Sequence, residues 1–371
     1  LAAGPVRGFG VTLTIGVLAS LFSALVLSRV LTEWLVDRKW VRAHPDSTGI
    51  AHHGRVRLWL QARSPNLMKN TARWLLISAV AVVISIAGIV VRGLDFGIEF
   101  TGGRIVEVST TQVVDVEDAR AAVADAGFPT AIVQESGDAD ISVRTSTISD
   151  AESASIADAI GEIGGGAEVV RDELIGPSLG EELLRNAIIA FVIALTAQLI
   201  YLAIRFRWTY GAGAVVALFQ NVIVTLGIFA WVGKPIDGIF LAAILTIIGY
   251  TVNDSVVVFD RIRETWRGSK GESFASVCNT AILNTLPRTV NTGISTLFIL
   301  TALLVLGGDS LSDFALALLL GIVIGTYSSN FTATPLAIEL ERRSPMAPPP
   351  AKKEEPRGRR SREDPNYGAV V

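Results

Sequence analysis

Seven segments of this chain are apolar over about 20 residues, the length that an α-helix needs to cross a bilayer. The 371-residue chain is 50% hydrophobic and only 18% charged, which is typical of integral membrane proteins rather than soluble domains. We therefore predict a polytopic α-helical membrane protein. The expected spans are residues 11–31, 74–91, 187–204, 212–232, 239–259, 289–306 and 314–335.

Lysine and arginine gather in every second connection between these spans. The connections 233–238 and 307–313 carry only Lys234 between them. The stretch 29–73, the turn 205–208, the loop after Phe259 and the tail after Glu341 are basic. Because basic loops of membrane proteins remain in the cytoplasm, we expect the linker 36–73 and the C-terminal tail 342–371 to be cytoplasmic.

The long segment 93–185 is soluble in composition and falls on the extracytoplasmic side by the same alternation. Its β-branched residues alternate as in strands, and its helical stretches end at glycines. The order β-α-β-β-α-β predicts a small ferredoxin-like α+β domain, a fold that identifies no function by itself. The expected elements are strand 104–110, helix 116–126, strands 130–135 and 140–145 around the turn Gly137-Asp138, helix 151–163 and strand 167–173.

Several classes of function find no support in the sequence. A net charge of −3 gives no reason to expect nucleic acid, and the lone Cys278 excludes an intramolecular disulfide. His44, His52 and His53 lie in a basic loop without the Cys or carboxylate cluster of a metal site. Neither a phosphate-binding loop nor a Ser/His/Asp order is present. We therefore expect no enzyme and no metal or cofactor, so any work must come from an ion gradient.

The tail from Ser344 onward is rich in Pro, Lys, Arg and Glu. Such a segment cannot bury enough apolar surface to fold, so we expect a solvated, disordered tail. Contact with anionic lipid or with a cytoplasmic partner is the alternative.

The first and last spans resemble each other, which suggests an internal repeat. Many transporters are built from repeated transmembrane halves, and the first span would then be the last helix of a preceding half. The alternative is that small-residue spacing recurs in any packed membrane helix. The matches at one constant offset are Phe9, Leu13, Gly16, Phe22 and Ser23 with Phe314, Leu318, Gly321, Tyr327 and Ser328.

One carboxylate, Asp254, falls inside an apolar segment. A charge at membrane depth is costly, so it needs a partner or a proton. Thr251, Asp254 and Ser255 have the i, i+3, i+4 spacing of one helix face. The neighbouring spans carry further polar residues, namely Gln220, Asn221 and Thr225 in one and the stripe Arg288, Asn291, Thr292 and Ser295 in the other.

The position of Asp254 favours pairing with Arg288. If its span ends near Phe259, Asp254 lies about 7–8 Å from the inner membrane edge, from 1.5 Å per residue. Arg288 would begin the next span at that edge, and its long side chain can reach inward. Burial disfavours a charged carboxylate and a nearby cation favours it. Asp254 is then a proton site. The alternatives are half of a structural ion pair, or a side chain that only hydrogen-bonds to hold two helices together. Asp260 is expected to be an interfacial charge.

Four motifs carry a resemblance to a known family. They are residues 96–103 (Phe-Gly-Ile-Glu-Phe-Thr-Gly-Gly), 175–180 (Ile-Gly-Pro-Ser-Leu-Gly), 249–264 around Val-Asn-Asp-Ser, and 286–297 beginning Leu-Pro-Arg-Thr. With these motifs, residues 66–341 resemble SecF, the smaller half of the SecDF protein-export factor of the RND superfamily. Residues 4–29 resemble the last membrane helix of SecD, and the chain begins with Leu, so a truncated SecD–SecF fusion is expected.

The resemblance implies a domain organisation and a set of site residues. Residues 1–35 would end a SecD-like half, 74–92 would be the first SecF-like span, 93–185 the extracytoplasmic domain and 186–341 five further spans. Asp254 and Arg288 would be the proton-path residues, with Glu99 standing where the family frequently has Asp. Supporting polar residues would be Asn253, Thr251, Asn291, Thr292 and Asn221, and the remaining motif positions Gly97, Phe100, Gly102, Gly103, Gly176, Pro177, Asp260 and Arg261.

The resemblance also implies a function. SecDF-like proteins promote late preprotein movement through the SecYEG channel with the proton motive force, in the bacterial inner or plasma membrane. The implied partners are a SecD half, SecYEG with other accessory subunits, the preprotein and lipid, and the coupling ion would be H⁺. An RND-type exporter of small molecules or lipids is the alternative, although the 93–185 domain is small for one. A non-transporting scaffold is a third possibility.

Overall fold

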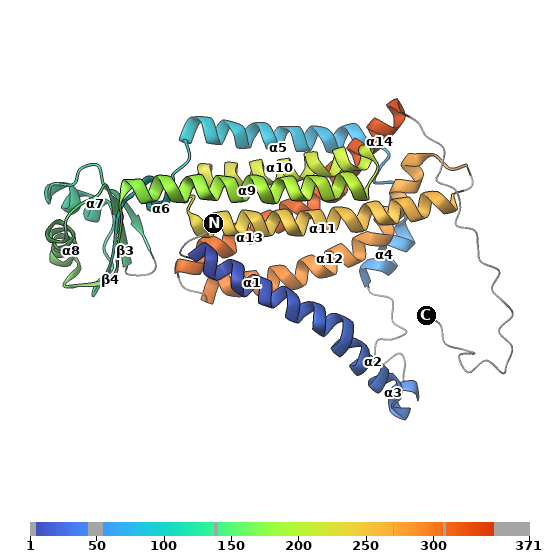
Figure 1. Cartoon of the computed structure of the whole chain (residues 1–371), viewed down its shortest axis with the longest axis horizontal. Coiled ribbons are helices and arrows are strands. Elements are labelled where there is room, and N and C mark those ends of the chain that lie inside the picture. The colour runs from blue at the N-terminus through green and yellow to red at the C-terminus, as the bar shows by residue number, and fades with distance from the viewer. Residues whose placement is uncertain (1–4, 44–54, 137–139, 270, 307–308, 345–371) are drawn as a thin grey trace.

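The computed structural model describes residues 5–43, 55–136, 140–269, 271–306 and 309–344. A bundle of long helices carries a small α/β domain at one end (Figure 1). The expected turn at Gly137-Asp138, the three histidines and the tail beyond Ser344 lie outside the described residues.

Within the described ranges, seven helical segments are long and apolar enough to cross a membrane. The predicted fold class of a polytopic helical protein with a small sheet domain is confirmed. Two spans are each built from two α-helices joined by a short π-helix. The elements are α1 (Pro5–Phe22), η1 (Ser23–Leu27) and α2 (Ser28–Val36), α5 (Thr71–Arg92), α9 (Pro177–Arg205), α10 (Trp208–Val232), α11 (Gly238–Gly268), α12 (Phe274–Leu306), and α13 (Asp309–Ser328), η2 (Ser329–Ala333) and α14 (Thr334–Arg343).

Several helices extend well beyond the predicted spans. Helix α11 continues nine residues past Phe259, and α12 begins at Phe274 and runs through Pro287. Helix α9 begins at Pro177, inside the range 93–185 that was predicted for the domain. Apolar content marks only the part of a helix that needs lipid, whereas backbone hydrogen bonding continues into polar sequence. The expected linker also contains two short helices, α3 (Lys39–Ala43) and α4 (Arg55–Arg63).

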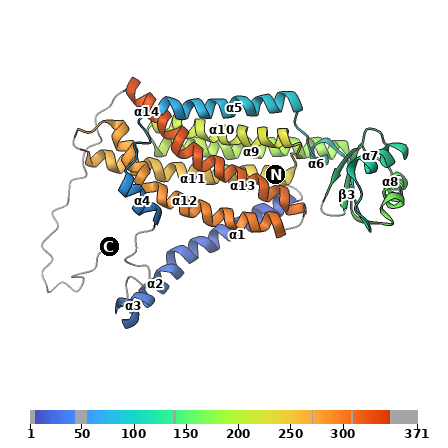
Figure 2. The ribbon, with the colours of Figure 1, turned by 180° about the vertical axis from the view of Figure 1, so that it is seen from behind.

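Helices α10 and α11 are the most buried of the described spans, with half of the apolar window of each buried. Tyr210 and Phe259 stack between them with ring centroids 5.2 Å apart. The α1–α2 segment contacts α11 and then diverges from the bundle (Figures 1 and 2). Its described side chains are exposed throughout.

The two π-helices support the predicted repeat. Element η1 covers Ser23–Leu27 and η2 covers Ser329–Ala333. With the offset that aligns Ser23 with Ser328, the two π-helices coincide to within one residue. Well under 1% of residues in globular proteins are in π-helices, so the coincidence favours a common origin of the two spans over chance spacing.

The α/β domain has the predicted ferredoxin-like topology. Strands β1 (Gly103–Thr110), β2 (Ile132–Glu135), β3 (Asp140–Thr145) and β4 (Ala167–Ile175) form one antiparallel sheet in the order β2-β3-β1-β4. Helices α7 (Val116–Asp125) and α8 (Asp150–Gly164) pack together on the face away from the bundle. The core between them is aliphatic, including Val106, Val108, Val143, Ile156 and Ile160.

One buried cation, Arg104, crosslinks this domain. Arg104 is only 5% exposed and donates through Nε and Nη2 to the two carboxylate oxygens of Asp172, both at 2.6 Å. Its guanidinium also pairs with Asp150 at 2.8 Å and donates to the Ile148 carbonyl at 3.2 Å. Ser153 donates to Asp172 at 2.9 Å. This fully satisfied cluster ties β1 to β4 and to α8.

The domain and the bundle meet along a short backbone junction. Phe96 and Ile236 form an isolated parallel bridge, in which the Gly97 amide donates to the Ile236 carbonyl at 3.0 Å. The Ile236 amide donates to the Asp95 carbonyl at 2.7 Å. The short helix α6 (Ile98–Thr101), which sequence patterns did not predict, follows the bridge and packs against the start of α9.

Candidate functional site

Asp254 lies near the middle of α11 rather than near its end. With a rise of 1.5 Å per residue, it is about 24 Å from the first residue of α11 and about 21 Å from the last. Helix α11 continues past Phe259 to Gly268, and the distance of Asp254 from the inner membrane edge stays a prediction. The carboxylate is half-buried between α11 and its neighbours.

Only one of the two Asp254 oxygens has a partner. Thr289 on α12 donates its hydroxyl to Oδ1 at 3.0 Å. Oδ2 is buried and makes no hydrogen bond within the described chain. A buried polar atom without a partner costs free energy, more so when it is charged. Among the described residues of the bundle, Asp254 is thus a carboxylate with one oxygen satisfied and the other not.

Arg288 does not form the expected ion pair with Asp254. The described residues contain no contact of 4 Å or less between the two side chains. Because α12 is continuous through Pro287, Arg288 lies inside the helix, and its side chain is exposed. The next residue, Thr289, faces α11 instead. Sequence spacing identified the right turn of α12 but not its rotation about its axis.

The rest of the α12 stripe is exposed together with Arg288. Asn291, Thr292 and Ser295 are exposed, and so is Asn253 on α11. Polar side chains within membrane helices normally face a protein interior or a water-filled cavity rather than lipid. We call Asn253, Arg288, Asn291, Thr292 and Ser295 the polar face. Its exposure indicates that a further protein surface or water covers this side of the bundle.

Asn221 and Thr251 belong to a different, fully buried network. The Asn221 amide donates to Thr251 Oγ1 at 2.6 Å and to the Gly321 carbonyl at 3.1 Å. A side chain at Gly325 would collide with both residues. This network holds α10, α11 and α13 together, so these two predicted supporting residues are separate from the exposed polar face.

Asp260 and Arg261 are placed at the end of the bundle opposite the α/β domain. Arg205 donates to both oxygens of Asp260, at 2.7 and 2.6 Å. Arg261 pairs with Glu264 at 2.7 Å. Both are partly exposed ion pairs, in agreement with an interfacial location and not with a place beside Asp254.

The glycine-rich motif shapes the junction. Gly102 and Gly103 have positive φ values of 72° and 134°, a region that favours glycine. A Cβ on Gly180 of α9 would lie 2.7 Å from the Gly102 amide nitrogen, and one on Gly97 would lie 2.8 Å from Asp237. Phe100 is buried, and Gly176 and Pro177 form the N-cap and first position of α9. The motif therefore allows the domain to approach α9 and α11 closely.

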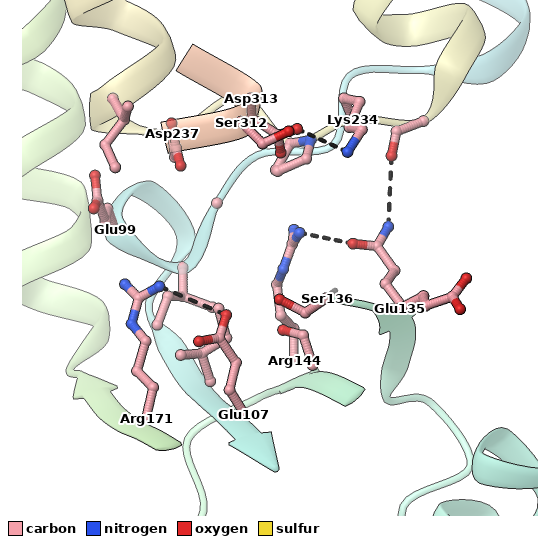
Figure 3. A pocket seen from close by; sticks show the side chains of 18 of the residues that line it. Glu99, Glu107, Glu135, Ser136, Arg144, Arg171, Lys234, Asp237, Ser312 and Asp313 are labelled. Carbon is pink, nitrogen blue, oxygen red and sulfur yellow. Dashed lines mark hydrogen bonds and ion pairs between the residues drawn. The ribbon is translucent and has the colours of Figure 1, made fainter. Parts of the chain in front are cut away.

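A polar cavity of about 340 Å³ opens at this junction (Figure 3). Charged side chains from both the domain and the bundle line it, including Glu99, Arg144, Arg171, Lys234, Asp237 and Asp313. Sequence reasoning assigned no role to Asp237. Its place directly before an apolar helical segment is an N-cap signal that marks it.

These features define a multi-pass membrane protein with a half-buried carboxylate in one of its candidate spans and a ferredoxin-like domain. Two families match the chain: "Protein export membrane protein SecD/SecF, C-terminal" over residues 155–343 and "SecD/SecF GG Motif" over residues 87–112. The second match covers the glycine motif described above.

Named relatives and a solved structure agree with this match. Protein translocase subunit SecF of Haemophilus influenzae is 37% identical, covering 75% of this chain and 87% of the relative. Protein translocase subunit SecDF of Thermus thermophilus is 36% identical over 92% of this chain and 46% of the relative. A crystal structure of SecDF from that organism matches with a TM-score of 0.82, 35% identity and the same coverage.

The chain belongs to the SecD/SecF family of protein-export membrane proteins. It spans about half the length of the SecDF relative and most of the SecF relative. A second solved SecDF structure, in a super-membrane-facing form, matches with a TM-score of only 0.65 at equal coverage. The arrangement described here therefore resembles the first of these two structures more than the second.

Proposed function

We propose that this chain is an auxiliary membrane subunit of the Sec translocase that uses the proton motive force to promote preprotein translocation and release through SecYEG. Membership of the SecD/SecF family and the names of its relatives support this role. We further propose that the basic connections are cytoplasmic, which places the α/β domain on the side where the preprotein emerges.

The observation that carries the proposal is the half-satisfied Asp254 carboxylate. Thr289 fixes Oδ1 at 3.0 Å while Oδ2 stays without a partner in the described chain. An ionised carboxylate in this state is costly, and a proton on Oδ2 removes that cost. The group is thus suited to alternate between a protonated and an ionised form as the bundle rearranges.

The polar face supports a proton path that is shared with a partner. Arg288, Asn253, Asn291 and Thr292 are exposed beside the helix turns that carry Asp254 and Thr289. We propose that a SecD half covers this face and that Arg288 stabilises the ionised form of Asp254 in the assembled complex. Protons are the proposed coupling ion, and other accessory Sec subunits are proposed neighbours.

The test compares two carboxylate variants in membrane vesicles that contain SecYEG and this chain together with its SecD half. Asp254→Asn keeps the shape and removes the proton-exchanging group, so stimulation of export by the proton motive force should be lost. Asp260→Asn on the same helix removes only a partly exposed ion pair with Arg205 and should leave most stimulation intact. Full stimulation by the Asp254→Asn complex, with normal assembly, would overturn the proposal.

A further inference from the structure

Two carboxylates from different parts of the molecule cap the start of α11. Asp237, the N-cap residue in the bundle, accepts from the Phe240 amide at 2.7 Å. Glu99, on α6 of the α/β side, accepts from the Gly238 amide at 2.7 Å across 139 residues of chain. Helix starts attract negative charge through their free amides, but here two acidic groups share one start (Figure 3).

The cations of the cavity are engaged by other acids. Arg171 pairs with Glu173 at 2.6 Å and approaches Glu107 at 3.8 Å. Arg144 pairs with Asp95 at 3.2 Å, and Lys234 pairs with Asp313 at 2.7 Å. Neither Glu99 nor Asp237 forms an ion pair within the described ranges. Backbone amides are therefore the direct hydrogen-bond partners of the two carboxylates, and Arg171 and Arg144 act on them only from a distance.

The surroundings make both carboxyl groups hold a proton more tightly than usual. Burial, and then the neighbouring Asp237 charge, raise the pKa of Glu99 against the opposing effect of the Gly238 amide. Arg171 lowers the pKa of Glu99 and Glu173 raises it, both more weakly. Burial likewise raises the pKa of Asp237, with Asp313 acting in the same direction and Arg144 in the opposite one.

We propose that Glu99 and Asp237 form a proton-operated latch, which holds the α/β domain on the start of α11 while the pair carries a proton and loosens when both are ionised. If the junction opens, Glu99 reaches water and its proton affinity returns to normal. Linkage then fixes the sign: the closed junction takes up a proton, so acid favours closure and rising pH favours opening.

The latch acts on the helix that carries Asp254. Glu99 is the side-chain contact that joins α6 directly to the first residue of α11, beside the backbone bridge at Phe96 and Ile236. A proton on this pair thus links the placement of the domain to the position of α11. This inference does not rest on the proton role of Asp254, because the latch lies outside the membrane-spanning part.

The experiment measures the distance between the domain and the bundle by paired spin labels, in the full chain in lipid nanodiscs. Asp118→Cys on α7 and Leu311→Cys on α13 place labels at exposed sites, and the native Cys278 is fully buried. A titration from about pH 5 to about pH 9 brackets a raised carboxyl pKa. We expect a narrow distance distribution in acid and a broad one in alkali, with a midpoint above the usual glutamate value of 4.5.

Variants with neutral side chains of the same shape show whether the pH response comes from Glu99 and Asp237 or from other groups. Glu99→Gln and Asp237→Asn keep an acceptor for the helix amides without the charge. Each variant should therefore show a narrow distance distribution at every pH. Glu99→Ala removes the acceptor, so its distance distribution should be broad at every pH. Glu135→Gln, an exposed carboxylate lining the same cavity, should titrate like the unmodified chain.

The latch and the proposed proton role of Asp254 fail in different ways. In the Asp254→Asn background the pH response should persist unchanged. A pH response that survives in the Glu99→Gln, Asp237→Asn double variant would overturn the latch, as would a wild-type distribution that does not change with pH. Loss of the response in Asp254→Asn alone would assign it to the membrane site instead.

Discussion

Arg104 in the α/β domain and Asp254 in the bundle are both ionisable groups withdrawn from water, but they differ in how many of their polar atoms have a partner. Arg104 has two carboxylates and a carbonyl around it, and each guanidinium nitrogen has a partner. Asp254 has one hydroxyl and an oxygen with no partner. A charged group whose polar atoms all have partners stabilises one arrangement of the side chains around it. A group with an unpartnered atom stabilises its present arrangement less, so a second protonation state is energetically accessible. The difference separates the rigid part of the molecule from the part suited to change.

The largest expected effect tests this contrast through stability. Arg104→Met leaves Asp172 without its main partner and should lower the free energy of unfolding of the domain by about 3 kcal/mol. Asp254→Asn should not lower stability, because it neutralises a carboxylate that the fold barely supports. Urea midpoints, read from hydrogen exchange of β1 and of α11 peptides, measure both.

A surface pair provides the control for Arg104. Arg120→Met removes an exposed pair with Glu117 and should cost below about 0.5 kcal/mol. Equal losses of unfolding free energy for Arg104→Met and Arg120→Met would contradict the proposed difference between Arg104 and Asp254. A large loss for Asp254→Asn would contradict it as well.

The next effect is on the acid sensitivity of the domain. The Arg104 hydrogen bonds lower the pKa of Asp172 below its ordinary value of 3.8. The ionised folded form is favoured, so this stability is present above that pH and is lost as pH falls through the lowered pKa. The stability advantage of the unmodified domain over Arg104→Met should therefore shrink below about pH 4. An advantage that is constant from neutral pH into strong acid would contradict the assigned pair.

The smallest effect concerns the one hydrogen bond of Asp254. Thr289→Val keeps the shape of the side chain and removes the donor to Oδ1, and hydrogen bonds between membrane helices contribute about 0.6 kcal/mol on average. Proton-driven export should fall about threefold and its pH optimum should shift, since a positioning residue alters how Asp254 titrates. Thr301→Val, whose hydroxyl only bonds the Leu297 carbonyl of its own helix, should leave both unchanged. Equal export rates and pH optima for Thr289→Val and Thr301→Val would show that Thr289 does not position Asp254.

The α/β domain could be predicted closely because its signals are local. Alternating Ile, Val and Glu residues in β1 and glycines after each helix gave the correct element order, and β3 was predicted with the observed ends. The helix ends in the bundle were less accessible, since the polar continuations of α11 and α12 carry no hydropathy signal. Sequence also missed α6, whose four residues are held by the junction rather than by their own propensity.

The partner of Asp254 required information that periodicity lacks. Arg288 and Thr289 are adjacent in sequence and about 100° apart around α12, as 3.6 residues per turn dictates. Which of them meets α11 depends on the packing rotation of the whole helix. The contact between Glu99 and Gly238 is likewise non-local, and only the acidic residue before α11 could have hinted at it.

The paired π-helices η1 and η2 bear on how this chain evolved. A π-helix inside an α-helical span is a rare single turn with i→i+5 hydrogen bonds, after which the α-helix continues. The two π-helices coincide to within one residue when the spans are aligned, as expected if the irregular turn predates the separation of the spans. A common origin of the two spans then implies an ancestral unit that carried this irregular turn before it was doubled.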